Sequence, residues 1–132
     1  MKTKQFLELA DAQKIIEAAS AHARSKGWAV TICVADDGGH LLALARLDGA
    51  APFTVSMAIA KANTAALGRR DSGLFEEAIN KGRTALATAP LTGLLEGGVP
   101  VLVDGQCIGA VGVSGVKSAE DAETARAGIA AL

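Results

Sequence analysis

The chain has 132 residues, half of them apolar, with 13 basic and 14 acidic side chains. This length suits one domain with one hydrophobic core, and we expect a single domain over residues 1–132. The charges are interspersed and the aromatic residues are only three Phe and one Trp, which argues against a nucleic-acid-binding surface built from clustered Lys and Arg or from stacking rings.

The first residues, MKTKQFLELADAQ, contain no apolar run of signal-peptide length. No later segment reaches the roughly 18 apolar residues that a membrane span needs. We therefore expect a cytoplasmic protein without a membrane partner. Cys33 and Cys107 lie far apart inside apolar runs, which favours two buried thiols over a disulfide.

Apolar residues recur every three to four positions from Leu9 to Lys26, which predicts an amphipathic helix that ends at Gly27. His22 lies at the edge of the apolar face, where its imidazole would point into a partly buried groove. A neutral imidazole is a common metal ligand and binds haem iron, so His22 is a candidate ligand. The alternative is a boundary histidine with one ring nitrogen in water.

Residues 28–48 predict a β-hairpin, because WAVTICVAD alternates, DDGG supplies turn residues and HLLALARLD reads as the returning strand. His40 follows the turn and is a further candidate ligand or acid/base group. A polar residue beside a turn needs no function, however. Arg46 interrupts the second strand.

Residues 54–67 predict an Ala-rich helix that Lys61 interrupts. A cation at Arg46 or Lys61 would bind a carboxylate, either a porphyrin propionate or a small organic acid. The alternative for both residues is a solvated face and a neighbouring acid. Further along, SGLFEEAINKG predicts a short helix ending at Gly82, whereas TALATAPLTGLLEGG is ambiguous between strand and loop.

The stretch GGVPVLVDGQCIGAVGVSG predicts a second hairpin with an Asp-Gly turn. Its glycines do not form a phosphate-binding loop, because neither GxGxxG nor GK[ST] occurs and no helix follows the glycines directly. Gly109 and Gly112 fall within a strand, where glycine often marks the close approach of a ligand or of another backbone. Both are candidates for lining a ligand site; the alternative is that they admit the Ala-rich helix onto the sheet.

A last helix is predicted from Ser118, which has capping-box spacing to Asp121. The predicted order is helix, hairpin, two helices, an uncertain strand, hairpin and helix. Two hairpins with flanking helices indicate an α+β domain with an antiparallel sheet.

The segments ICVADDGGHLLALARLDGA, SMAIAKANTAALGR and LEGGVPVLVDGQCIGAVGVSG, with the closing EDAETARAGIAAL, resemble the GlcG/HbpS-like family, whose domain is often labelled haem-degrading. A related domain forms the C-terminal part of PduO-type proteins. The resemblance runs over about residues 5–132. It implies a profilin- or roadblock-like fold with a five-stranded antiparallel sheet, and homo-oligomers that are frequently octamers. Some relatives bind haem, the PduO-type domains through a histidine on the first helix, and EAASAHARSKG puts His22 at the similar position.

Three hypotheses follow from these residues and from the resemblance. The first is a cytoplasmic oligomer of a catabolic operon that binds haem or a related tetrapyrrole through His22. The second is an accessory enzyme or binding protein for a small organic acid or an alcohol-derived metabolite. The third is a structural oligomer without a ligand. No residue pattern identifies a catalytic residue. The sequence therefore leaves open whether the protein is an enzyme, and whether it would bind haem or degrade it.

Overall fold

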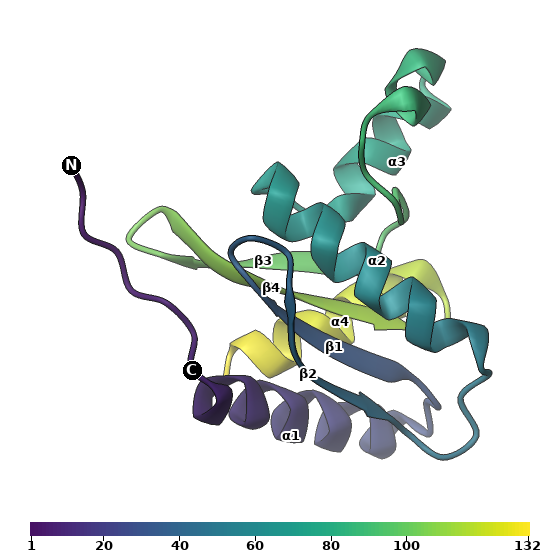
Figure 1. Cartoon of the computed structure of the whole chain (residues 1–132). Coiled ribbons are helices and arrows are strands. Elements are labelled where there is room, and N and C mark those ends of the chain that lie inside the picture. Colours follow the sequence, from purple (N-terminus) through teal and green to yellow (C-terminus); the bar gives the residue numbers. More distant parts are fainter.

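The computed structural model describes residues 1–132 and contains four α-helices, one 3₁₀ helix and four β-strands (Figure 1). In chain order these are α1 (Leu9–Lys26), β1 (Thr31–Asp36), β2 (Leu41–Arg46), α2 (Phe53–Gly68), α3 (Ser72–Asn80), η1 (Thr84–Thr88), β3 (Gly98–Val103), β4 (Gln106–Ser114) and α4 (Ser118–Ile129). None of the helices is both long enough and apolar enough to cross a membrane.

The strands form one antiparallel sheet in the order β2-β1-β4-β3. Both predicted hairpins are present: β1 pairs with β2, and β3 pairs with β4. The two hairpins join through β1 and β4, so that Cys33 lies opposite Leu44 on one side and Gly112 on the other. The α+β class with helices flanking an antiparallel sheet is therefore confirmed.

The expected fifth strand is absent. Residues 84–88 of the ambiguous segment form the 3₁₀ helix η1, and the chain then runs as a loop to β3. Pro90 in this loop has no N–H to donate to a ladder. Gly93 and Gly97 have φ values of 70° and 134°, so the backbone there is not extended. The Thr64 hydroxyl donates to the carbonyl of Thr92 and ties the loop to α2.

The molecule has three layers, in which α2 covers one face of the sheet while α1 and α4 cover the other (Figure 1). The larger core lies on the α1/α4 side, where Val111 and Val113 of β4 pack with Ile15 of α1. The α2 side is made of small residues: Ala58 and Ala62 pack against the sheet. Because side chains alternate along a strand, β4 presents valines to one helical layer and small residues to the other.

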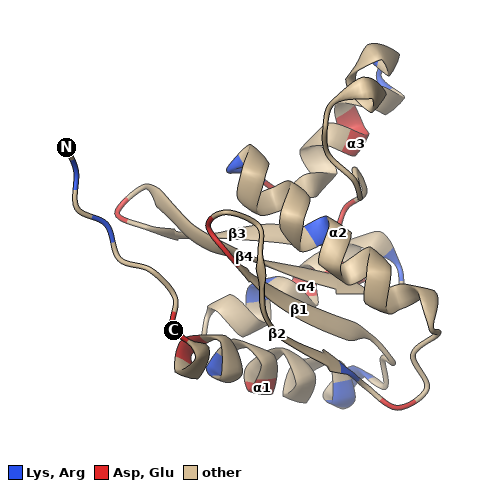
Figure 2. Ribbon diagram, in the orientation of Figure 1, with Lys and Arg blue, Asp and Glu red and all other residues tan.

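Acidic and basic residues are spread over the molecule, and α1 carries both signs along its length (Figure 2). The two helices of the α1/α4 layer run side by side in contact. Gly128 of α4 permits this, because a Cβ there would meet Ile15 and Ala19 of α1. The last turn of α4 thus lies beside the middle of α1.

Candidate functional site

His22 lies on the outer side of the α1/α4 layer and is partly exposed, with 26% of its side chain accessible. Its Nε2 is 2.7 Å from a carboxylate oxygen of Glu123 on α4. The imidazole packs edge-on against Trp28, with 5.9 Å between the ring centroids. If Nε2 carries the proton and donates it to Glu123, the lone pair of Nδ1, which makes no hydrogen bond within the chain, is available to a metal.

Trp28 also lines a shallow hollow of about 300 Å³ at the carboxyl end of α1. His22 itself is adjacent to this hollow through Trp28 but is not one of its walls. The hollow is lined by Arg24, Gly27, Trp28, Ala29, Leu47 and Asp48. It therefore combines an indole and an aliphatic side chain with one basic and one acidic group.

Arg46, at the end of β2, is engaged within its own chain. Its Nε and Nη2 both donate to the carbonyl oxygen of Ala50, at 3.0 and 2.8 Å. The guanidinium thereby holds the turn that leads from β2 into α2. Two of its five N–H groups are used in this way, and the residue is exposed.

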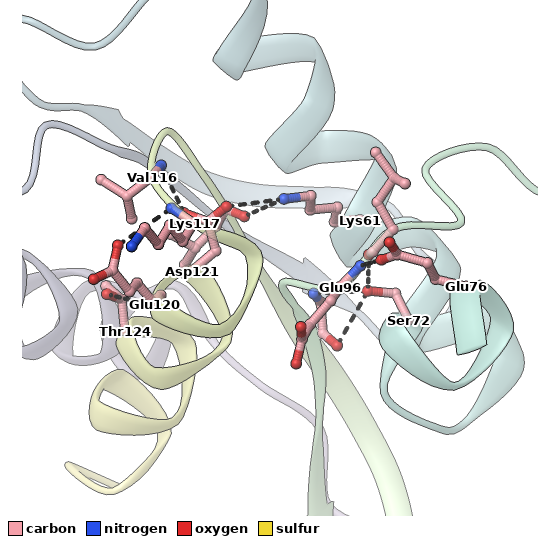
Figure 3. Close-up of polar contacts among 12 residues, drawn as sticks. Lys61, Ser72, Glu76, Glu96, Val116, Lys117, Glu120, Asp121 and Thr124 are labelled. Carbon is pink, nitrogen blue, oxygen red and sulfur yellow. Dashed lines mark hydrogen bonds and ion pairs between the residues drawn. The ribbon is translucent and has the colours of Figure 1, made fainter. Parts of the chain in front are cut away.

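Lys61 of α2 is buried and makes two polar contacts within the chain (Figure 3). Its ammonium donates to the Val113 carbonyl at 3.0 Å and to the Asp121 carboxylate at 3.1 Å, and the two charged side chains are only 4% and 3% exposed. Burial raises the pKa of the Asp121 carboxyl above its ordinary value, and the Lys61 charge partly offsets this shift. The other oxygen of Asp121 accepts from the backbone N–H of Val116.

This arrangement differs from the predicted capping box, because Asp121 turns away from the helix start to Lys61 and Val116. Glu120 accepts from the backbone N–H of Lys117 instead, and Lys117 precedes α4. Lys61 has no free N–H facing solvent that a propionate or an organic acid would reach. Its two contacts within the chain account for its position in an apolar helix.

Gly109 and Gly112 face opposite layers of the molecule. A Cβ on Gly112 would meet the backbone of Ala58 and Ala62, so this glycine admits α2 onto the sheet, as the alternative interpretation held. A Cβ on Gly109 would meet Leu7 of the amino-terminal segment. Protein atoms therefore fill the space beside both glycines.

The five predicted site residues do not converge in one place. His22 lies in the α1/α4 layer, Lys61 is buried under α2 on the other side of the sheet, and Arg46 lies at the end of an edge strand. His40, the other histidine, is exposed at the β1–β2 turn, where its backbone N–H donates to Asp36. No group of three or more His, Cys, Asp or Glu side chains is placed to hold a metal ion.

Sequence reasoning missed Glu123 and Trp28 as neighbours of His22, and Asp121 as the partner of Lys61. The His22–Glu123 contact joins residues 101 positions apart, and the Lys61–Asp121 contact joins residues 60 positions apart. Trp28 did carry a signal, since it follows the Gly27 helix stop by one residue and so must lie close to the last turn of α1.

The chain belongs to the HbpS-like family: the family model described as "Haem degrading protein HbpS-like" matches residues 7–130. The sequence is 58% identical over 114 residues to the protein GlcG of Escherichia coli K12, an alignment that covers 86% of this chain and 85% of GlcG. The expected GlcG/HbpS-like membership is thereby confirmed.

Solved structures agree with this assignment. A double mutant of Streptomyces reticuli HbpS has a TM-score of 0.90 and 32% identity, and the match covers 100% of this chain and 90% of that chain. A complex titled PduOC:Heme has a TM-score of 0.86 and 22% identity, covering 97% of this chain and 96% of that chain. At that identity the second likeness shows the fold alone.

Proposed function

We propose that this protein binds haem or a closely related tetrapyrrole, with His22 as the candidate iron ligand. The observation that carries the proposal is the His22–Glu123 pair at 2.7 Å on an accessible helix face, within a chain of the HbpS-like family. Histidine ligands of metals commonly donate their other ring N–H to a carboxylate, which fixes the tautomer and raises the basicity of the ligating nitrogen. The donor set at His22 fits this pattern.

Each residue around His22 has a separate role in this proposal. Glu123 accepts the Nε2 proton and orients the ring, while the Trp28 indole holds the imidazole edge-on. The hollow beside Trp28 offers an apolar wall, and Arg24 at its rim supplies a cation for a propionate. Bound haem would supply an iron centre with redox and ligand-binding chemistry.

The hollow beside Trp28 is too shallow to enclose a macrocycle within one chain, because ligand sites usually bury most of the ligand's surface. We therefore propose that a second copy completes the site in a homo-oligomer, an octamer as the family resemblance implies. A cytoplasmic location and a catabolic operon remain part of this proposal. We propose binding and not degradation, because the residues around His22 include no group that would supply electrons.

A hemin titration of the full-length protein, followed in the Soret region, tests the proposal. We expect a saturable Soret shift for the wild type, which His22→Ala removes. His40→Ala is the matched control, because His40 is the only other histidine and is exposed at a turn. A spectrum in His22→Ala identical to that of the wild type would exclude His22 as the ligand.

A further inference from the structure

A larger hollow of about 410 Å³, lined mostly by hydrophobic residues, lies near the start of α1, away from His22. Its floor includes Val101 of β3 and Ile108 of β4, which are 1% and 5% exposed and belong to the main core. Eight of its eleven lining residues are hydrophobic. The full lining is Gln5, Phe6, Leu7, Asp11, Lys14, Val101, Leu102, Val103, Ile108, Ile129 and Leu132.

The amino-terminal segment forms one wall of this hollow because it is fastened to the sheet. Leu7 is buried over Gly109, whose missing side chain leaves it room. Lys4 donates to the carbonyl of Cys107 at 3.2 Å and pairs with Asp37 at 2.5 Å. These contacts hold residues 4–7 against β4 and the β1–β2 turn, so the wall is part of the fold.

Two charged side chains, Asp11 and Lys14, line the hollow, and neither forms an ion pair within the chain. Asp11 accepts from the backbone N–H of Glu8 at 2.9 Å and so is used at the start of α1. Lys14, one turn further along α1, makes no ion pair or hydrogen bond within the chain. A hollow lined mostly by hydrophobic side chains, with the free Lys14 ammonium at its edge, is complementary to a hydrocarbon that carries one negative charge.

We propose that this hollow binds a small monocarboxylate with an apolar body, of about the size of a medium-chain fatty acid. The hydrocarbon lies on Val101 and Ile108 between the amino-terminal segment and α4, and the carboxylate meets Lys14. Asp11 on the same wall repels anions, and it disfavours a doubly charged head group such as a phosphate more than a monocarboxylate. The site shares no residue with His22 and its neighbours, so it is a second binding function.

Calorimetric titration of the full-length protein with decanoate tests this inference. We expect saturable binding of decanoate, weaker binding of decanol, which lacks the charge, and no measurable binding of butyrate, which lacks the hydrocarbon. Absence of saturable decanoate binding to the protein in its native assembly overturns the inference. It does so also if the reason is that another copy of the chain covers the hollow.

Two variants locate the site. Lys14→Gln should weaken decanoate binding roughly two- to fivefold, the range for one exposed ion pair, and leave decanol unchanged. Lys26→Gln is the matched control on the same helix, because Lys26 lines none of the hollows. Leu102→Asp at the exposed rim should weaken decanoate binding further, because it removes an apolar contact and adds a like charge. Equal decanoate affinity in Lys14→Gln and the wild type overturns the inference.

The His22→Ala variant separates this inference from the haem proposal. It should bind decanoate with wild-type affinity, and loss of decanoate binding in that variant would contradict a separate site. Loss of hemin binding with decanoate binding intact supports both proposals. Failure of hemin to bind the wild type, with decanoate bound at Lys14, overturns the haem proposal alone.

Discussion

Lys61 and Asp121 are the two charged side chains that this fold buries. Removing two charges from water is costly, and their attraction offsets that cost only where further hydrogen bonds satisfy both groups. Val113 supplies an acceptor to the ammonium, and Val116 supplies a donor to the carboxylate. The pair joins α2 to the start of α4 around the end of β4, so it connects the two helical layers.

Breaking this pair from one side should therefore destabilise the protein strongly. Lys61→Met leaves the Asp121 carboxylate buried without its counter-charge, and we expect a loss of about 3–5 kcal/mol in the free energy of unfolding. Urea denaturation followed by circular dichroism measures this loss. The double variant Lys61→Met, Asp121→Asn should lose less than the sum of the two single variants, because no orphan charge remains.

The exposed pair of Lys81 and Glu77 is the control for that measurement. Its nitrogen–oxygen distance is 2.6 Å, but both side chains are more than half exposed. Lys81→Met should change the free energy of unfolding by less than about 1 kcal/mol, because water already screens the pair. An equally small effect of Lys61→Met would contradict the role assigned to the buried pair.

At the scale of elements, the contact between α2 and the sheet is made without large side chains. Ala58 and Ala62 lie directly over Gly112 of β4, so the helix backbone approaches the strand backbone closely. Ala65, Ala66 and Ala110 continue the same kind of contact. The position of α2, and with it that of Lys61, depends on the size of the residue at Gly112.

Gly112→Ala should push α2 away from the sheet. The added methyl group would meet the carbonyl of Ala58 and the backbone of Ala62, neither of which can rotate away as a side chain can. We expect a loss of about 1–3 kcal/mol, the usual cost of overpacking, seen as a lowered midpoint in thermal unfolding. Gly38→Ala, where a Cβ would make only ordinary contacts, should change stability by less than about 0.5 kcal/mol. Equal effects of the two substitutions would contradict this account.

The elements that the sequence predicted correctly are those with local signals. Alternation around DDGG and around the Asp104-Gly105 turn marked both hairpins, and the end of α1 coincides with Gly27, whose φ is 72°. The fifth strand was implied by the family resemblance, and the residues of TALATAPLTGLLEGG had left the choice between strand and loop open. Loop geometry there depends on contacts with α2, such as that between Thr64 and Thr92, which no local pattern encodes.

On the scale of the whole molecule, the three layers enclose both thiols. Cys33 lies in a central strand beneath α2 with no accessible surface, and Cys107 is also buried and unpaired, which confirms the expectation of two free buried thiols. Burial raises the pKa of the Cys33 thiol to about 12. The reactive thiolate is therefore scarce at pH 8 as well as inaccessible.

We therefore expect Cys33 to react with a thiol reagent only when the whole domain opens. Labelling at pH 8, followed by mass spectrometry, should be slow for the native protein and should accelerate across the urea unfolding transition. A Ser25→Cys variant, which adds a thiol at an exposed position, provides the rapid reference. Rapid labelling of Cys33 in the native protein would show that α2 detaches locally, without global unfolding.

Much less of the candidate site than of the fold was predictable. His22 was expected at the edge of a helix's apolar face, pointing into a partly buried groove; it is partly exposed on α1 and lines no hollow, and its carboxylate neighbour comes from a helix about 100 residues later. Lys61 was expected to bind a ligand carboxylate or to lie on a solvated face, and Asp121 to cap a helix, whereas the two residues form a buried pair with each other. The apolar hollow near Lys14 combines segments from both ends of the chain, and no single stretch reveals it.

The alanine face of α2 responds to substitutions in the opposite way from most protein interiors. In a leucine-rich core, truncation is the damaging change, because it leaves empty volume. Here almost nothing remains to truncate, and every conservative enlargement forces two main chains apart. Sequence drift along this face is therefore restricted to glycine, alanine and residues of similar bulk, however hydrophobic the larger replacements are.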